Sequence, residues 1–305
     1  MLKDLLPKVV LDALSKYKEN EVFEVRLRRN SPVLVNVLGR NRVLTVGMGV
    51  GGEKVYSSGS IIDYVVKKAT ENSLYAYNNQ IKQGFITARG GIRLGIAGES
   101  VNSDEFMPTT IKNINSIDIR IPHQVKGCAL SVFKFIYNKE SGLKNTLIIS
   151  PPGVGKTTML RDICRMISEI CEPILNTLLV DERFEIASVL DGEPMLDVGY
   201  YTDIVSGANK KYAFTNGIRA LKPDVIITDE LMSEDDGKAC ELAIKSGVKV
   251  IATIHATNHL ELLEKPSFAQ LIKQKFFDRY VVLSNKKGVG TCSGIFDKDL
   301  NCLYF

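Results

Sequence analysis

Residues 146–158 read TLIISPPGVGKTT, and this stretch decides the fold of the second half of the chain. The apolar run Leu147–Ile149 predicts a buried strand. A turn rich in proline and glycine follows, and after Lys156 the apolar residues recur at helical spacing. A strand, a glycine-rich loop and a helix in this order are the context that a phosphate-binding loop requires.

The chemistry of this loop follows from its residue types. Glycine lets the backbone approach a phosphate closely, and the following helix N-terminus offers unpaired N–H groups. We expect Lys156 to reach the β- and γ-phosphates of ATP and the Thr157 hydroxyl to hold Mg²⁺. The predicted nucleotide-binding residues are Pro152, Gly153, Val154, Gly155, Lys156, Thr157 and Thr158.

The loop departs from the common pattern at one position, because Ser150 stands where G-x-x-x-x-G-K-[ST] begins with glycine. A glycine-rich turn with an unrelated lysine is the alternative interpretation. The predicted strand before the loop and the helix after it favour nucleotide binding.

Composition limits the class of protein. The 305 residues suggest two domains, and 45% hydrophobic with 24% charged residues are typical of a globular protein. The net charge of +4 is modest, and there is no basic tail or concentrated charge run. No apolar stretch approaches the length of a membrane span. Residues 1–20 predict an amphipathic helix rather than a signal peptide.

The cysteines and histidines do not indicate a metal site. The six cysteines form no C-x-x-C pair, so free thiols in a reducing cytosol are expected. His255 and His259 have a spacing that could share a metal on a helix, but no acidic residue lies between them.

Residues 1–138 predict a smaller α+β domain. Strands are expected at 23–28 and 33–38 as a hairpin, at two places within 85–99 around Gly90-Gly91, and at 117–122 as an edge-like strand ending at proline. The sequence from Ser60 to Asp63 predicts a capping box and a helix start. Gly47–Gly52 resembles a dinucleotide loop, but no suitable helix follows, and a flexible loop is expected.

Residues 139–305 predict an α/β domain, which the polar stretch 138–145 separates from the first. Alternating strands and helices predict a mainly parallel sheet with its ligand at the carboxyl ends of the strands. The expected strands are 146–150, 177–180, 224–228, 248–254 and 280–284, with shorter ones near 292–296 and 302–305.

Polar groups follow three of these strands. The strand from residue 224 ends in Asp229 and Glu230, which is a Walker B arrangement: Asp229 would hold the Mg²⁺ shell and Glu230 would orient the attacking water. Asp181 and Glu182 follow another strand and are further candidate catalytic residues, because the ends of the strands of one parallel sheet are expected to face the nucleotide. His255 follows a third, where it could sense the γ-phosphate or stabilise transition-state charge, although a surface histidine is the simpler alternative.

Together these motifs resemble the superfamily of type II and type IV secretion and pilus motor ATPases. The segment Ile218–Glu230 resembles that family's Walker B motif, with Asp229 where those enzymes usually have glycine. Ala243 and Gly247 with Thr253–Ala256 resemble its His box, and Asp181-Glu182 with Glu185 resembles its Asp box.

The resemblance is closer to one subfamily, the stage III sporulation protein AA ATPases, and extends over nearly the whole chain. Ser150, in place of the first glycine of the loop pattern, also resembles this subfamily. Tyr201, in contrast, stands where the subfamily is expected to have a basic residue. The matching blocks are Glu24–Arg28, Gly90–Arg93, Ser116–Pro122, Asp181–Ile186, Asp197–Gly199 and Thr202-Asp203.

This resemblance implies a RecA-like, hexameric ATPase that uses ATP and Mg²⁺. It implies a cytoplasmic protein, peripheral at the membrane on the mother-cell side, that energises assembly of or transport through the channel to the forespore with membrane channel proteins as partners. It also implies that arginines of the N-terminal domain reach the phosphates, for which Arg93 and Arg120 are the candidates.

Two other classes of function stay open. A nucleic-acid-dependent ATPase of RecA or AAA+ type could carry the same loop, but the modest charge and the lack of a helix-turn-helix argue against specific nucleic-acid binding. A non-catalytic assembly scaffold could bind ATP without cleaving it, but would not need Glu230 as a base. A small-molecule kinase is disfavoured, since no lid signature follows the loop.

Overall fold

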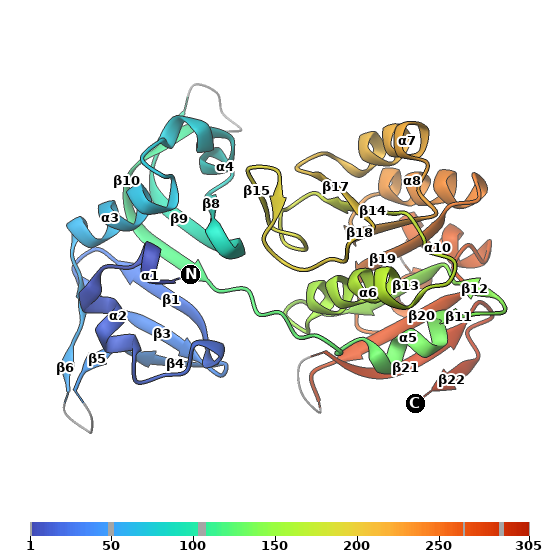
Figure 1. The fold of residues 1–305 in the computed structure, drawn as a ribbon, viewed down its shortest axis with the longest axis horizontal. Coiled ribbons are helices and arrows are strands. Elements are labelled where there is room, and N and C mark those ends of the chain that lie inside the picture. The colour runs from blue at the N-terminus through green and yellow to red at the C-terminus, as the bar shows by residue number, and fades with distance from the viewer. Residues whose placement is uncertain (1, 48–51, 103–107, 265, 287–289, 305) are drawn as a thin grey trace. The chain divides into compact units, whose positions relative to one another are not determined.

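The computed structural model describes residues 2–47, 52–102, 108–264, 266–286 and 290–304 (Figure 1). The chain forms two compact units, one of Met1–His123 with Leu190–Met195 and one of Gln124–Val189 with Leu196–Phe305. The expected boundary after residue 138 therefore lies inside the second unit. The reason is that Ala129, Val132, Phe133, Ile136 and Tyr137 are buried in the core of that unit.

A six-stranded antiparallel sheet organises the first unit, in the order β4-β3-β1-β10-β9-β8. Alternate residues such as Val25 and Leu27 are buried in a core shared with the helices. The sheet strands are β1 (Val22–Arg28), β3 (Leu34–Val37), β4 (Arg40–Val43), β8 (Phe85–Ala88), β9 (Ile92–Asn102) and β10 (Pro108–Arg120). The helices are α1 (Leu2–Leu5), α2 (Lys8–Leu14), α3 (Gly59–Ala69) and α4 (Asn78–Lys82). Shorter elements are η1 (Glu19–Glu21), β2 (Ser31–Pro32), β5 (Thr45–Val46), β6 (Glu53–Lys54), β7 (Tyr56–Ser57), η2 (Leu74–Tyr77) and η3 (Arg89–Gly91).

The predicted hairpin of the first unit is confirmed, since β1 pairs with β3 in antiparallel register. The single N-terminal helix was a wrong prediction. Pro7 has extended backbone angles and separates α1 from α2, because proline restricts the residue before it and donates no backbone hydrogen bond. The predicted loop at Gly47–Gly52 falls largely on residues 48–51, which lie outside the described residues.

Two further predictions for this unit need correction. The cap of α3 is Ser58 rather than Ser60, and its Oγ accepts a hydrogen bond from the Ile61 N–H at 3.4 Å. The strand that contains residues 117–120 is β10, which lies between β1 and β9 and is not an edge strand. Pro122 is compatible with this central position because it lies beyond the end of β10.

An eight-stranded sheet organises the second unit, in the order β17-β14-β18-β19-β13-β20-β21-β22. The first six strands in this order run parallel, and β21 and β22 continue the sheet antiparallel. The strands are β13 (Thr146–Ser150), β14 (Thr177–Asp181), β17 (Thr202–Ser206), β18 (Val225–Leu231), β19 (Lys249–His255), β20 (Arg279–Ser284), β21 (Thr291–Asp297) and β22 (Cys302–Tyr304). A small hairpin of this unit is β11 (Tyr137–Asn138) with β12 (Gly142–Leu143). A second small hairpin, β15 (Val189–Leu190) with β16 (Glu193–Pro194), lies mostly in the segment Leu190–Met195, which belongs to the first unit.

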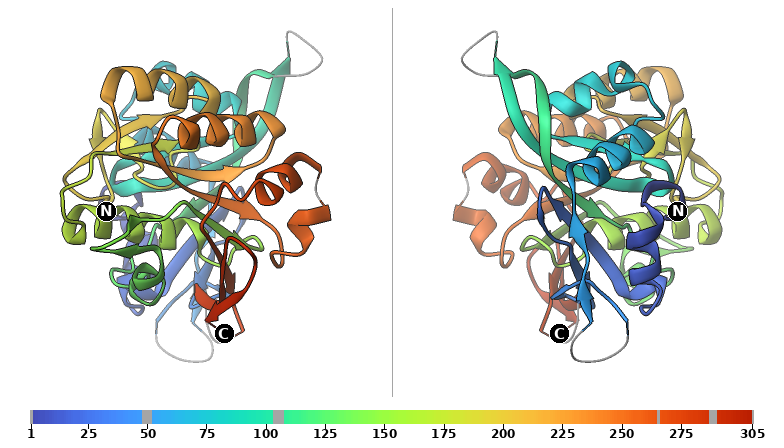
Figure 2. Two further views of the ribbon diagram at one scale, coloured as in Figure 1. Left: turned by 90° about the vertical axis from the view of Figure 1, so that its right-hand side faces the viewer. Right: turned by 90° about the vertical axis from the view of Figure 1, so that its left-hand side faces the viewer.

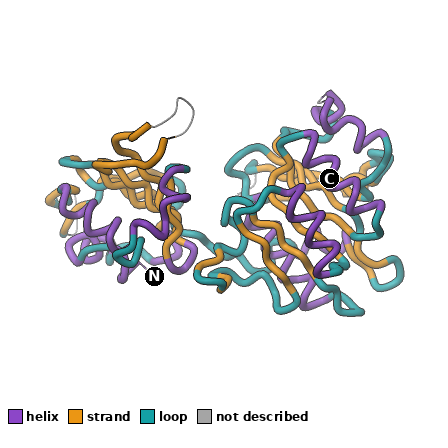
Figure 3. Tube along the Cα trace, turned by 90° about the horizontal axis from the view of Figure 1, so that it is seen from above, coloured by secondary structure: helices purple, strands orange, loops and turns teal. Residues whose placement is uncertain are grey.

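Helices cover both faces of this sheet (Figures 2 and 3). Ile148 of β13 packs in the core cluster that contains α5 and α6, whereas Leu147 and Ile149 pack in the cluster that contains α7, α8 and α10. Both faces are therefore dry, which explains the nearly continuous apolar runs of the parallel strands. The helices are α5 (Leu130–Ile136), α6 (Lys156–Ile170), α7 (Lys210–Leu221), α8 (Glu234–Lys245), α9 (Glu261–Glu264) and α10 (Pro266–Lys273).

The predicted mainly parallel α/β sheet is confirmed, and each strand expected between residues 146 and 305 overlaps an observed one. The prediction missed β17, an edge strand whose Thr202 and Asp203 interrupt the apolar pattern. The six cysteines are all free thiols. Within the described part of the chain, no helix has the length and apolar character to cross a bilayer.

Candidate nucleotide-binding site

The loop between β13 and α6 has the backbone geometry of an anion-binding turn. Gly153 and Gly155 have φ angles of 71° and 93°, in the left-handed region that suits glycine. Gly155 is the N-cap of α6, so the loop leads into the positive end of a 15-residue helix. Ser150 ends β13 and precedes the turn, and its buried hydroxyl donates to the Pro151 carbonyl at 2.8 Å.

Lys156 is the first residue of α6, and its side chain folds back over the loop. Its Nζ donates to the carbonyls of Ser150 and Pro151 at 3.1 and 3.2 Å. Burial lowers the pKa of Lys156, while the negative charge of Glu230 opposes that shift. The predicted Walker B glutamate and the loop lysine therefore lie close enough to influence each other electrostatically.

The parallel register brings His255 beside the loop. The last residue of β13, Ser150, pairs with His255 at the end of β19. Because β19 lies between β13 and β18, His255 is positioned between the phosphate-loop strand and the Walker B strand. The His255 side chain is exposed.

The register of β18 changes where the carboxylates begin. Thr228 pairs with Ala252 and Glu230 with Thr253, so Asp229 is the extra residue of a β-bulge. The bulge redirects the Asp229 carboxylate into a buried position with 14% of its side chain exposed. Burial raises the pKa of Asp229 to about 6, Asp181 and Glu182 act in the same direction, and Lys210 opposes the shift.

Lys210, which the sequence analysis missed, connects two of the predicted acids. It is the first residue of α7, and 3% of its side chain is exposed. Its Nζ lies 2.6 Å from Glu182 Oε2 and 3.0 Å from Asp229 Oδ1. Burial acts to lower the pKa of Lys210, but the two carboxylates outweigh it and the pKa is raised. A lysine that follows Asn209 at the start of an amphipathic helix carries no signal in sequence that it will be buried.

Asp181 is fully buried and holds the loop that follows β14. Its Oδ1 accepts the Glu185 N–H at 2.8 Å, and its Oδ2 accepts the N–H groups of Ile186 and Ala187 at 3.1 and 2.9 Å. Arg161 of α6 secures the same loop by donating to the carbonyls of Ile186 and Glu185 at 2.6 and 2.7 Å. The observed contacts of Asp181 are thus structural ones that fix the position of Glu182.

Arg93 and Arg120 lie in the first unit, whereas the other predicted site residues lie in the second. They are cross-strand partners on β9 and β10. Arg120 Nε lies 3.0 Å from Asp118 Oδ2, and the Arg93 guanidinium lies 4.3 Å from the centre of the Phe85 ring. Arg26 also contacts Asp118, at 3.0 Å, so these side chains form a charged cluster on one face of the sheet.

The residues of the second unit fit a magnesium nucleotide. Two positive-φ glycines form a concave backbone turn of the kind that binds phosphate. Asp229 Oδ1 is buried and, within the described ranges, has an ion-pair contact but no hydrogen-bond partner. A carboxylate oxygen in this state suits a hydrated magnesium ion, and Thr157 at the start of α6 has a hydroxyl of the kind that could contribute to such a site.

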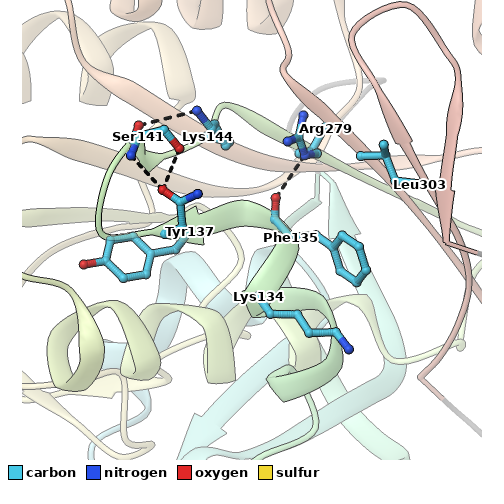
Figure 4. Close-up of a pocket in the computed structure, with 8 residues that line it drawn as sticks. Lys134, Phe135, Tyr137, Ser141, Lys144, Arg279 and Leu303 are labelled. Carbon is cyan, nitrogen blue, oxygen red and sulfur yellow. Dashed lines mark hydrogen bonds between the residues drawn. The ribbon is translucent and has the colours of Figure 1, made fainter.

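A separate surface pocket in the same unit has a volume of about 260 Å³ and does not involve these residues (Figure 4). Its polar groups largely satisfy one another: Arg279 donates to the Phe135 carbonyl at 2.9 Å, and Ser141 donates to Asn138 Oδ1 at 2.7 Å. It is lined by Lys134, Phe135, Tyr137, Asn138, Ser141, Lys144, Arg279 and Leu303. None of the residues predicted to bind nucleotide lines it.

Sequence comparison gives matches along the whole chain. A family model described as "Sporulation stage III, protein AA" matches residues 1–303. Stage III sporulation protein AA of Bacillus subtilis (strain 168) is 34% identical over 307 residues, which cover 99% of this chain and 96% of that protein. The protein SEEDLING PLASTID DEVELOPMENT 1 of Arabidopsis thaliana is 30% identical over 156 residues, 50% of this chain and 22% of its own length.

Solved structures of secretion ATPases share the fold. The ATPase DotB of Yersinia pseudotuberculosis has a TM-score of 0.58 at 17% identity, with 90% of this chain and 73% of that chain covered. The pilus retraction motor PilT with bound ADP has a TM-score of 0.57 at 12% identity, with 90% and 77% covered. At these identities the likeness establishes the fold alone, and it confirms the predicted RecA-like architecture.

Proposed function

Because this chain belongs to the stage III sporulation protein AA family and has the fold of secretion ATPases, we propose that it hydrolyses ATP as a cytosolic ring ATPase. The observation that carries the proposal is the meeting of the phosphate loop, His255 and Glu230 at the ends of adjacent parallel strands. Ligands of open α/β sheets bind at this edge.

Each residue has a proposed part in the reaction. The turn from Pro152 to Gly155 surrounds the phosphates, with Lys156 leaving the carbonyls of Ser150 and Pro151 to pair with them. Thr157 and, through water, Asp229 would hold Mg²⁺, which would supply neutralisation of the phosphate charge. Glu230 orients the attacking water and receives its proton, and His255 stabilises charge on the γ-phosphate.

The biological setting is proposed from the family. The protein would act at the membrane on the mother-cell side during sporulation, through membrane channel proteins, and would energise channel assembly or transport. A hexamer is proposed from the resemblance to secretion ATPases. Arg93 and Arg120 of the first unit are the proposed arginines for the phosphates, once Arg120 is released from Asp118.

The test is steady-state phosphate release with Mg-ATP over a range of protein concentration, beside Glu230→Gln. We expect turnover in the wild type, with specific activity rising with concentration, and a loss of about 10²–10⁴-fold in the variant with ATP still bound. Undiminished hydrolysis by Glu230→Gln would remove Glu230 as the base. If the wild type shows no turnover, alone or with its membrane partners, the protein is a nucleotide-bound scaffold.

The competing proposal of a nucleic-acid-dependent ATPase has a direct control. Addition of single- or double-stranded DNA should leave phosphate release unchanged. Stimulation that weakens steeply with salt would favour that class instead.

A further inference from the structure

A buried ammonium group lies among the acids at the edge of the parallel sheet. Lysine is almost never buried to the extent of Lys210 unless it is paired. Its partners come from two different strands: Glu182 directly follows β14, and Asp229 forms the bulge of β18. Lys210 itself is fixed at the first turn of α7, where the Asn209 side chain caps the helix.

The Lys210 ammonium is the counterion of the Glu182 and Asp229 carboxylates. Asp181 adds negative potential at Asp229, but three backbone N–H groups already satisfy its carboxylate. On α8, the buried thiol of Cys240 interacts electrostatically with Lys210. Burial raises the pKa of this thiol to about 12, so it stays protonated and adds no negative charge. The charge balance of the site in the nucleotide-free protein therefore depends on Lys210, Glu182 and Asp229.

We propose that Lys210 is a positioning residue that holds the Glu182 and Asp229 carboxylates in place and competes with the divalent cation for Asp229. The inference rests on the proposed function, in which Asp229 serves the magnesium shell. The ammonium lies 3.0 Å from Asp229 Oδ1, the oxygen that a metal-bound water would contact. Two cations at one oxygen repel each other, so metal binding moves Lys210 toward Glu182, which already holds it at 2.6 Å.

This competition predicts weak metal binding without nucleotide and a clear effect of removing the ammonium. The experiment measures binding of Mn²⁺ alone to the full-length, nucleotide-free protein by the electron paramagnetic resonance signal of free Mn²⁺. Lys210→Met keeps most of the length of the side chain and removes its charge, and should bind Mn²⁺ at least about tenfold more tightly than the wild type. Lys211→Met is the matched control on the exposed neighbouring position and should leave the affinity unchanged.

The variant Lys210→Met leaves the mostly buried Asp229 carboxylate and the partly exposed Glu182 carboxylate without this counterion, so its folding is checked by circular dichroism. If it does not fold, Lys210→Met combined with Glu182→Gln keeps the net charge of the cluster. This double variant should still bind Mn²⁺ more tightly than the wild type, because Asp229 no longer faces an ammonium. Wild-type Mn²⁺ affinity in whichever of the two variants folds overturns the proposal.

The result is separable from the test of ATP hydrolysis. Tighter Mn²⁺ binding without any phosphate release would uphold the role of Lys210 and sink the catalytic proposal. Phosphate release by the wild type, together with unchanged Mn²⁺ affinity in the Lys210 variants, would uphold the catalytic proposal and overturn the role of Lys210. Lys210→Arg, which keeps the charge, should retain the weak Mn²⁺ binding of the wild type.

Discussion

Ser150 and His255 are register partners at the carboxyl ends of β13 and β19. The pair joins the start of the phosphate loop to the strand that separates it from the Walker B strand β18. Position 255 therefore lies at the same edge of the sheet as the start of the loop. This relationship makes His255 the histidine to test first.

We expect His255→Ala to lower ATP turnover by about 10²-fold, the order of effect for losing one group that stabilises developing charge. Nucleotide affinity should change little, because the loop and Lys156 supply most of the contacts to the ground state. Phosphate release and binding of a fluorescent ATP analogue measure the two quantities. His259→Ala is the matched control, since its ring packs against Phe296 at 4.0 Å and has no proposed part in the reaction. Equal turnover in the two variants would refute a special role for His255.

Lys156→Ala should weaken nucleotide binding by about 10²-fold, because a hydrogen-bonded charge pair contributes roughly 1.5–3 kcal/mol. The fold should tolerate the change, since the hydrogen bonds of Nζ within the described part of the chain go to two carbonyls of the loop itself. Equilibrium binding of a fluorescent ATP analogue provides the measurement, with Lys211→Ala as the control on an exposed lysine. Unchanged affinity in Lys156→Ala would mean that this loop does not bind the phosphates.

Asp181→Ala should lower the stability of the folded protein. The substitution leaves three N–H groups of the loop, at Glu185, Ile186 and Ala187, without their acceptor. Unsatisfied buried donors cost about 1–3 kcal/mol each, so the free energy of unfolding should fall by roughly 3 kcal/mol or more. Urea denaturation measures the loss, and amide hydrogen exchange should quicken at those three residues. A wild-type unfolding curve together with lost turnover would show instead that Asp181 acts in catalysis.

The sequence predicted the parts of the site that local pattern encodes. The loop from Ser150 to Lys156, the strand of Asp229 and Glu230, and the position of His255 follow from apolar runs that end in particular polar residues. Contacts that depend on the packing of distant elements could not be predicted this way. Lys210 is 19 positions before Asp229 in the chain and becomes its partner only because α7 begins over the ends of β14 and β18.

The same limit explains the errors in the first unit. The strand ending before Pro122 has the alternation of a half-exposed strand, which edge and central strands of an open sheet share. The strand is central because it pairs with β1 on one side and β9 on the other. Pairing between strands far apart in the chain cannot be read from the local sequence. The boundary at residue 138 was misplaced for a related reason, because the polar stretch 138–145 forms a hairpin on the second unit and is not a linker.

Asp162 of α6 provides a test in which pH reports on a buried ion pair. Its Oδ2 accepts the Ala129 N–H at 2.8 Å, and its Oδ1 accepts Arg165 Nε and Nη2 at 3.0 and 2.7 Å. Burial acts to raise the pKa of Asp162, but these donors outweigh it and hold the pKa below the ordinary value of 3.8. The folded state therefore favours the ionised carboxylate. Its contribution to stability is complete above the ordinary pKa and is lost as the pH falls below that value toward the pKa of the folded protein.

We expect Asp162→Asn to lower the free energy of unfolding by about 2 kcal/mol, since the mostly buried Arg165 guanidinium loses one carboxylate partner and keeps the other, the half-exposed Glu169. The deficit relative to wild type should stay constant from about pH 8 to about pH 5 and narrow below about pH 4, where the wild-type carboxylate begins to protonate. Denaturant unfolding of the wild type and of Asp162→Asn across this pH range measures the deficit. Glu234→Gln, which removes an exposed partner of Lys238, is the matched control and should change stability by no more than about 1 kcal/mol. A stability deficit that narrows already near neutral pH would mean that the pKa of Asp162 is raised in the folded protein. The ion pair with Arg165 would then not be the interaction that stabilises this part of α6.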